Sequence, residues 1–97
     1  MGVAIDSIVS PGCIVSGGRV MKSILAPGVR VNSYCDVDSS ILLTNVEVGR
    51  YSRLRRVIIA EGVKIPEGTD IGMHPDQDAE RGFTITESGV TVVGQMN

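Results

Sequence analysis

The sequence predicts an all-β fold, a three-sided parallel β-solenoid of about four coils, and two observations lead to it. The stretch 29–71 can be laid over itself at a shift of seventeen residues with its aliphatic pattern intact, and a repeat of fixed period is read before any local propensity. Within each period, a large aliphatic residue also recurs every five or six positions. This series consists of Val9, Val15, Val20, Leu25, Val31, Val37, Leu42, Val48, Leu54, Ile59, Ile65 and Ile71.

The residue two places before each of these aliphatics is always small or β-branched. One large inward residue and one compact neighbour per short strand, with three strands per turn, is the hexapeptide form of a solenoid. An α-helix would need apolar residues at spacings of three and four, and the strands of a sandwich would need longer runs with a period of two. Neither alternative fits the chain. The compact residues are Ser7, Cys13, Gly18, Ser23, Val29, Cys35, Ser40, Val46, Ser52, Val57, Val63 and Thr69.

Turn residues mark the corners between the strands. Residues 7–12 are repeated sixteen residues later by 23–28, and both segments end in Pro-Gly. Proline fixes φ and glycine tolerates a positive φ, as a sharp turn between flat strands requires. In the third coil Asn45 takes the place of this glycine, because Asn is the next most tolerant residue in the left-handed region. Gly62 restores glycine in the fourth coil.

The two ends of the chain depart from the repeat. Ala4 precedes Val9 by five residues and is expected to be the inward residue of an incomplete first coil. A solenoid end normally carries a polar cap, and none is evident here, so we expect something N-terminal to cover this end.

At the other end the period stops at Met73. Residues 73–82 are polar and are expected to form an ordered loop, and residues 83–86 and 90–93 are expected to form a hairpin around Glu87-Ser88-Gly89. Its apolar face would consist of Phe83, Ile85, Val90 and Val92. The predicted organisation is one domain, with coils over 1–72 and a C-terminal loop and hairpin over 73–97 that packs on the coils or on a partner.

Composition excludes several function classes. A net charge of −2 and a pI near 5.2 argue against a nucleic-acid binder, which wants a strongly basic face. No apolar run approaches the eighteen residues of a membrane span, and the start does not resemble a signal peptide. Cys13 and Cys35 occupy inward positions of different coils, which favours buried reduced thiols. We therefore expect a cytoplasmic protein that binds neither nucleic acid nor a membrane.

Catalytic residues of the usual kinds are missing from the predicted coils. Hexapeptide acyltransferases need a histidine base and γ-type carbonic anhydrases need three histidine ligands, but His74 is the single histidine and falls after the last coil. Asp36, Asp38 and Asp70 are expected to be outward charges of the strands. The sequence thus predicts no catalytic residue and no metal site.

Four arginines form the one candidate binding cluster: Arg50, Arg53, Arg55 and Arg56. Guanidinium groups suit phosphate esters, which favours an anion-binding or effector site. The alternative is a charged structural surface, because Asp36 and Asp70 lie seventeen residues on either side of Arg53 and would stack against it. Tyr34 and Tyr51 are also one turn apart and are expected to stack at a corner.

Several segments resemble a known family. Residues 7–18, 29–43, 48–59 and 65–72, including Asn32-Ser33 and Arg55-Arg56, are similar to the C-terminal domain of bacterial ADP-glucose pyrophosphorylases (glucose-1-phosphate adenylyltransferases). The resemblance covers nearly the whole chain. It implies a left-handed parallel β-helix, although a left-handed crossover runs against the usual rule for parallel strands.

The resemblance also implies a function. In that family an N-terminal nucleotidyltransferase domain, with Mg²⁺, joins ATP and glucose 1-phosphate into ADP-glucose for glycogen synthesis. The β-helix domain contacts it, supports a homo-oligomer and contributes to an allosteric site for anionic metabolites. Arginines that some relatives place at this site correspond to Glu61 and Gln95 here, a departure from the pattern. This chain is expected to need no cofactor and to be non-catalytic alone; the alternatives are a trimeric hexapeptide acyltransferase and a ligand-free scaffold.

Overall fold

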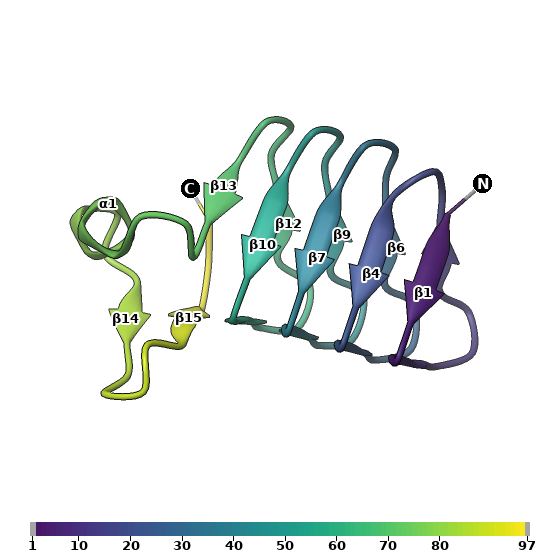
Figure 1. Ribbon diagram of the computed structural model, residues 1–97, viewed down its shortest axis with the longest axis horizontal. Coiled ribbons are helices and arrows are strands. Elements are labelled where there is room, and N and C mark those ends of the chain that lie inside the picture. Colours follow the sequence, from purple (N-terminus) through teal and green to yellow (C-terminus); the bar gives the residue numbers. More distant parts are fainter. Residues whose placement is uncertain (1, 97) are drawn as a thin grey trace.

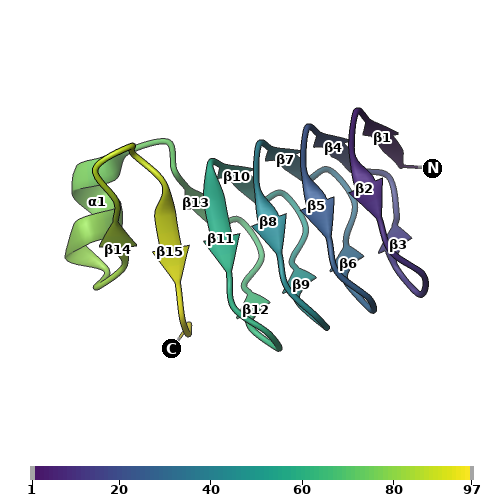
Figure 2. The ribbon, with the colours of Figure 1, turned by 90° about the horizontal axis from the view of Figure 1, so that it is seen from below.

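Residues 2–96 are described by a computed structural model, in which the chain winds into a solenoid with three flat sides (Figures 1 and 2). Each side is a sheet whose strands come from successive coils and run parallel. The first sheet contains β1 (Val3–Ile5), β4 (Arg19–Met21), β7 (Asp36–Asp38), β10 (Arg53–Arg55) and β13 (Asp70–Ile71). The second contains β2 (Ile8–Val9), β5 (Ile24–Leu25), β8 (Ile41–Leu42) and β11 (Val57–Ile59). The third contains β3 (Ile14–Val15), β6 (Arg30–Val31), β9 (Glu47–Val48) and β12 (Lys64–Ile65).

The register of the strands reproduces the period of the sequence. Leu54 of β10 pairs with Val37 of β7 and with Ile71 of β13, seventeen residues away on either side. The step between the first two coils is sixteen residues, since Val3 pairs with Arg19. Residues one period apart therefore form continuous columns along the solenoid.

Aliphatic columns fill the interior. The members of the predicted inward series from Val20 to Ile71 are all buried, which confirms the hexapeptide frame. Burial of a Val, Leu or Ile side chain contributes about 1.5–3 kcal/mol, so this stack is the main source of stability. The first two members behave differently, because no coil covers them: Val9 is 42% exposed and Val15 is half-buried.

The compact column beside them includes buried serines that bond to the backbone. Ser23 Oγ donates to the Met21 carbonyl at 2.8 Å and accepts the Ser40 amide at 3.0 Å. Ser40 Oγ donates to the Asp38 carbonyl and accepts the Val57 amide in the same way. Each hydroxyl thus satisfies an amide of the next coil, and burial of an unpaired amide would be costly.

The corners adopt the turn geometry that the sequence predicts. Gly28 has φ 78° and Asn45, one coil later, has φ 62°. A Cβ atom at Gly28 would overlap Asn45 Oδ1, so any larger residue there would have to displace the Asn45 side chain as well as adopt a positive φ.

The C-terminal segment differs in part from its prediction. Residues 75–80 form a short helix, α1 (Pro75–Glu80), so the expectation of a loop throughout 73–82 was wrong. Pro75 stands in the first turn, where its missing N–H costs nothing, and Asp76 and Asp78 suit the positive end of a helix. A helix of this length leaves no periodic signal in the sequence.

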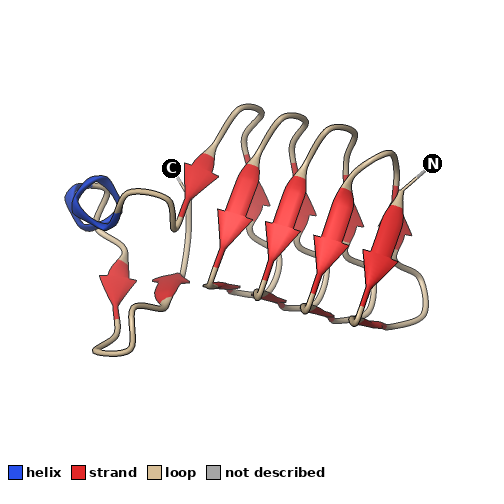
Figure 3. Ribbon diagram, viewed as in Figure 1, coloured by secondary structure: helices blue, strands red, loops and turns tan. Residues whose placement is uncertain are grey.

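The predicted hairpin is present as β14 (Thr84–Ile85) and β15 (Thr91–Val93), which pair antiparallel (Figure 3). β15 also pairs parallel with β11 and so extends the second sheet by one strand. This pairing turns Thr91 and Val93 inward and leaves Val92 only half-buried, so the predicted apolar face was wrong at Val92. Phe83 packs against the core as expected.

Candidate functional site

The four arginines of the predicted anion site lie along β10 and its two flanking corners. Arg53 and Arg55 flank the buried Leu54 and point outward from one face of the strand. Arg50 lies at the corner before the strand, and Arg56 lies at the corner after it with φ 53°. Only Arg53 and Arg55 therefore share a strand face.

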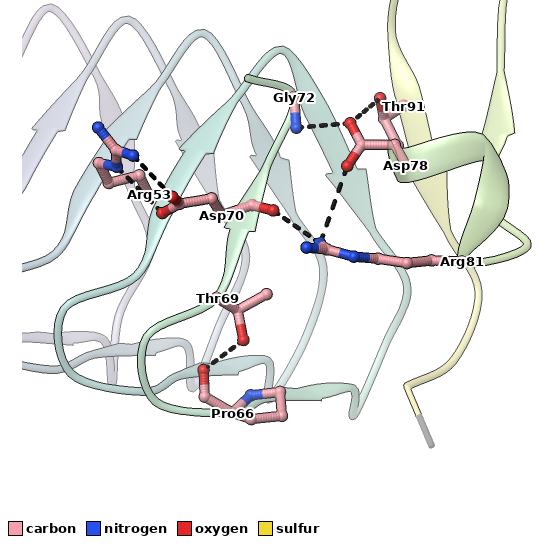
Figure 4. A network of polar contacts seen from close by, with 8 residues as sticks. All are labelled: Arg53, Pro66, Thr69, Asp70, Gly72, Asp78, Arg81 and Thr91. Atoms are coloured by element: carbon pink, nitrogen blue, oxygen red, sulfur yellow. Dashed lines mark hydrogen bonds and ion pairs between the residues drawn. The ribbon is translucent and has the colours of Figure 1, made fainter. Parts of the chain in front are cut away.

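Arg53 is held by an ion pair with Asp70. Arg53 Nε lies 3.0 Å from Asp70 Oδ1, and Nη2 lies 2.6 Å from Oδ2, a two-point geometry that Figure 4 shows. The hydrogen bonds from Arg53 lower the pKa of Asp70 below its usual value, and the same bonds raise the pKa of Arg53. Asp36 occupies the register position on the other side of Arg53. The structural partners proposed for Arg53 are thus in place, with the direct pair made to Asp70.

Arg56 also has an intramolecular partner. Its Nη2 donates to the backbone carbonyl of Ser88, in the tight loop of the hairpin. Its guanidinium lies close to Gly89, where an added Cβ would come 3.3 Å from Nη1. Arg56 therefore ties the hairpin to the coils. Among the described residues, Arg50 and Arg55 form no ion pair, and they remain the two candidates for an anion ligand.

A second polar network attaches the C-terminal segment to the last coil, and sequence reasoning missed it. Asp78 of α1 is 1% exposed; its Oδ2 accepts the Gly72 amide at 2.8 Å and the Thr91 hydroxyl at 3.5 Å. Arg81 donates to the Asp70 carbonyl at 2.7 Å and lies 3.8 Å from the Asp78 carboxylate (Figure 4). The periodic part of the sequence gives no signal for these contacts.

Three open cavities lie around this C-terminal segment, and the smallest of them, of about 240 Å³, is lined by Arg81, Phe83, Gln95 and Met96. One, of about 400 Å³, is lined by residues 61–64 and 94–96. It contains both Glu61 and Gln95, the two positions that the family resemblance associates with an effector site. Another, of about 460 Å³, is lined in part by Arg81, Phe83 and Gln95. Lys64 and Arg81 are the cationic side chains at these walls, and neither belongs to the predicted cluster.

The remaining candidate residues are separate from one another. His74 is exposed just before α1, outside the coils. Cys13 and Cys35 are both free thiols; burial raises the pKa of Cys35, and its Sγ lies 3.0 Å from the Gly49 carbonyl oxygen. Within residues 2–96, no three His, Cys, Asp or Glu side chains gather in one place as a metal-ligand group. No helix in the same range is long and apolar enough to span a membrane.

Comparison with known proteins indicates the same hexapeptide-repeat fold. The family model described as GlmU-like, C-terminal hexapeptide matches residues 1–93. A glucose-1-phosphate adenylyltransferase of Koribacter versatilis is 56% identical over 96% of this chain and 22% of its own length. Those of Frankia casuarinae and Rhodopirellula baltica are 48% and 50% identical over 97% of the chain.

These matches cover only the C-terminal part of the relatives, so the chain spans less than a quarter of their length. The hexapeptide family and the three parallel sheets together make the fold a left-handed β-helix. The chain belongs to the GlmU-like C-terminal hexapeptide family, and its sequence corresponds to the C-terminal part of glucose-1-phosphate adenylyltransferases.

Proposed function

We propose that this chain acts as the structural, oligomerising and regulatory domain of a glucose-1-phosphate adenylyltransferase, in the cytoplasm. The observation that carries the proposal is the match at 56% identity over 96% of the chain, confined to the C-terminal part of the relative. Chemistry on ATP and glucose 1-phosphate belongs, in this proposal, to a nucleotidyltransferase domain that corresponds to the N-terminal part of the relatives.

The N-terminal end of the solenoid supports a docking role for the domain. β1, β2 and β3 are the edge strands of the three sheets at this end, and their unpaired backbone groups can pair with a partner. The exposed apolar residues of this end are Val3, Ile5, Ile8, Val9 and Ile14. Contiguous apolar surface of this kind marks interaction sites in soluble proteins. The occupant that we propose is the catalytic domain.

The C-terminal cavities support the regulatory part of the role. Glu61 and Gln95 line one cavity together, and Lys64 and Arg81 stand at the walls of the two larger cavities. Mixed charge and polarity suit a small polar metabolite. Arg50 and Arg55 are a second candidate surface for an anionic effector, on the outer side of β10 and its preceding corner.

A reconstitution experiment tests the docking role. The 97-residue chain is mixed with the separately expressed N-terminal part of the Koribacter relative, and sedimentation velocity measures complex formation. We expect a complex to form. Its activity in making ADP-glucose from ATP and glucose 1-phosphate, with Mg²⁺ present, should persist longer than the activity of the N-terminal part alone. Ile8→Lys at the open end should abolish the complex, whereas Lys64→Ala at the far end should leave it intact. Absence of a complex, or turnover by the 97-residue chain alone, would refute the proposal.

A further inference from the structure

Tyr34 and Tyr51 form an exposed aromatic pair at one corner of the solenoid. Their ring centroids are 5.0 Å apart and the planes are inclined by 7°, although the residues are 67% and 56% exposed. Both have φ 62°, a left-handed conformation that is strained for a bulky side chain. The equivalent corners of the neighbouring coils carry Gly17 and Gly68, with φ 80° and 75°. This corner therefore accepts glycine readily, yet two coils place tyrosine there.

The glycines leave the two ends of the stack uncovered. Because Gly17 has no side chain, the ring face of Tyr34 that turns away from Tyr51 meets no side chain from that position of the preceding coil. An open cavity of about 360 Å³ lies there, lined by Tyr34, Gly17 and Gly18 together with Val3, Arg19, Cys35 and Asp36. This volume lies near the lower end of the range of small-molecule sites.

Opposite charges stand at the wall of this cavity. Arg19 is exposed, and its guanidinium donates a hydrogen bond to the weak acceptor Met21 Sδ at 2.9 Å. Asp36 is its register neighbour on β7, but the two form no ion pair in the described part of the chain. Arg19 is thus available to an anion, and the Asp36 carboxylate, which only accepts hydrogen bonds, suits N–H groups at the edge of a ring.

From this arrangement we infer that the cavity beside Tyr34 binds a flat aromatic ring that bears an anionic group. The ring stacks on the open face of Tyr34 over Gly17, and the anionic group pairs with Arg19. Base-on-aromatic stacking is tolerant of the ring's identity, so nucleotides and aromatic carboxylates share the required chemistry. This site lies on different residues from the four arginines and from the C-terminal cavities. It shares Val3 with the proposed docking end, but the argument for it does not depend on the proposed function.

Proton NMR of the tyrosine rings reports binding directly, because the chain has two Tyr and no Trp. The complete probes are guanosine 5′-monophosphate and indole-3-acetate. The controls are ribose 5-phosphate, which lacks the aromatic ring, and indole, which lacks the anionic group. We expect at least one complete probe to move the Tyr34 ring signals more than those of Tyr51, with a dissociation constant on the order of 1 mM. The tighter of the two complete probes identifies the source of the ligand.

Gly17→Tyr and Gly68→Tyr are a matched pair of variants. Each adds a third tyrosine at the left-handed corner position that Tyr34 and Tyr51 already occupy, but only the first fills the cavity. A Cβ atom at Gly17 would lie 3.2 Å from Ser33 Oγ, so that hydroxyl must shift slightly, whereas one at Gly68 meets no atom within 4 Å. Gly17→Tyr should abolish binding, and Gly68→Tyr should preserve it. Should Gly17→Tyr fail to fold, Tyr34→Leu and Tyr51→Leu make the same comparison, with binding lost only in the first.

Arg19→Gln tests the anion contact. The variant should raise the dissociation constant of the anionic probe about tenfold, a factor typical of one charge-assisted contact. The weak binding of indole should stay unchanged. The proposal is overturned if neither complete probe shifts Tyr34, if both glycine variants weaken binding equally, or if ribose 5-phosphate binds as tightly as guanosine 5′-monophosphate.

Discussion

Asp78 of helix α1 accepts the backbone amide of Gly72 at 2.8 Å and so joins the helix to the end of the last coil. Gly72 cannot be replaced by a residue with a side chain without a shift of the backbone, because a Cβ atom there would overlap the Arg55 carbonyl oxygen. We expect Asp78→Ala to cost about 1–3 kcal/mol, since it leaves the partly buried Gly72 amide and the buried Thr91 hydroxyl without their acceptor. Urea unfolding measures the loss.

Asp78→Asn is the control for that variant. The amide keeps one oxygen as an acceptor, so the loss should be smaller than in Asp78→Ala. The Gly72 amide should exchange its hydrogen faster in Asp78→Ala than in Asp78→Asn or in the wild type. Equal stability of the wild type and the alanine variant would show that α1 is not fastened by this contact.

The hexapeptide frame is tested most sharply at two adjacent leucines. Leu42 is fully buried in the inward column, whereas Leu43 is 39% exposed. Leu42→Asp places an unpaired carboxylate among aliphatic side chains and should cost several kcal/mol, which is comparable with the stability of a small domain. Leu43→Asp should be nearly neutral. Thermal melts of both variants distinguish them, and similar melting temperatures would contradict the frame.

Acid should weaken the link between Arg53 and Asp70. Because the pKa of Asp70 is lowered in the folded chain, its contribution to stability is present above the unfolded value, about 3.9, and is lost as pH falls through the folded value. The difference in unfolding free energy between wild type and Asp70→Asn should therefore shrink below about pH 4. Denaturant titrations from neutral to acidic pH measure it. Parallel stability curves for the two proteins would contradict the coupling.

Self-association is expected when the open N-terminal end has no other partner. The surface is mainly apolar, so an oligomer should persist at raised salt, whereas one held by the arginines of β10 and its corners should dissociate as screening increases. Sedimentation at low and high salt separates these cases. Ile8→Lys should favour the monomer, and Ile24→Lys, on the flank of the next coil, should not. A monomer of the unmodified chain under both conditions would refute the expectation.

Most of the fold was predictable because its information is periodic. The inward column from Val20 to Ile71, the stacking of Tyr34 on Tyr51 and the pairing of Arg53 with Asp70 all follow from a shift of seventeen residues. One alignment of the sequence on itself places each of these residues beside its neighbour.

The C-terminal part was less predictable because its contacts are not periodic. The bond from Asp78 to Gly72 and the reach of Arg81 to Asp70 depend on how one short helix docks. Thr91 and Val93 point inward because β15 pairs with β11, whose residues precede their partners by thirty-four positions. The alternation of residues within the hairpin does not reveal this long-range pairing. The cavities beside Gln95 arise from the same docking.

The serine column has a consequence for how such a chain can change its length. Ser23 and Ser40 occupy the same position in successive coils and make the same bonds. Removal of residues 24–40 would join Ser23 directly to Ile41, with each column still in register and each amide still facing a hydroxyl. Loss of a single residue within a strand would instead displace the side chains that follow it, and such a loss is accommodated only where a corner absorbs it, as in the sixteen-residue step between the first two coils. The solenoid can therefore gain or lose material in whole turns, so that evolution can adjust the distance between its two ends in steps of one strand spacing, about 4.8 Å.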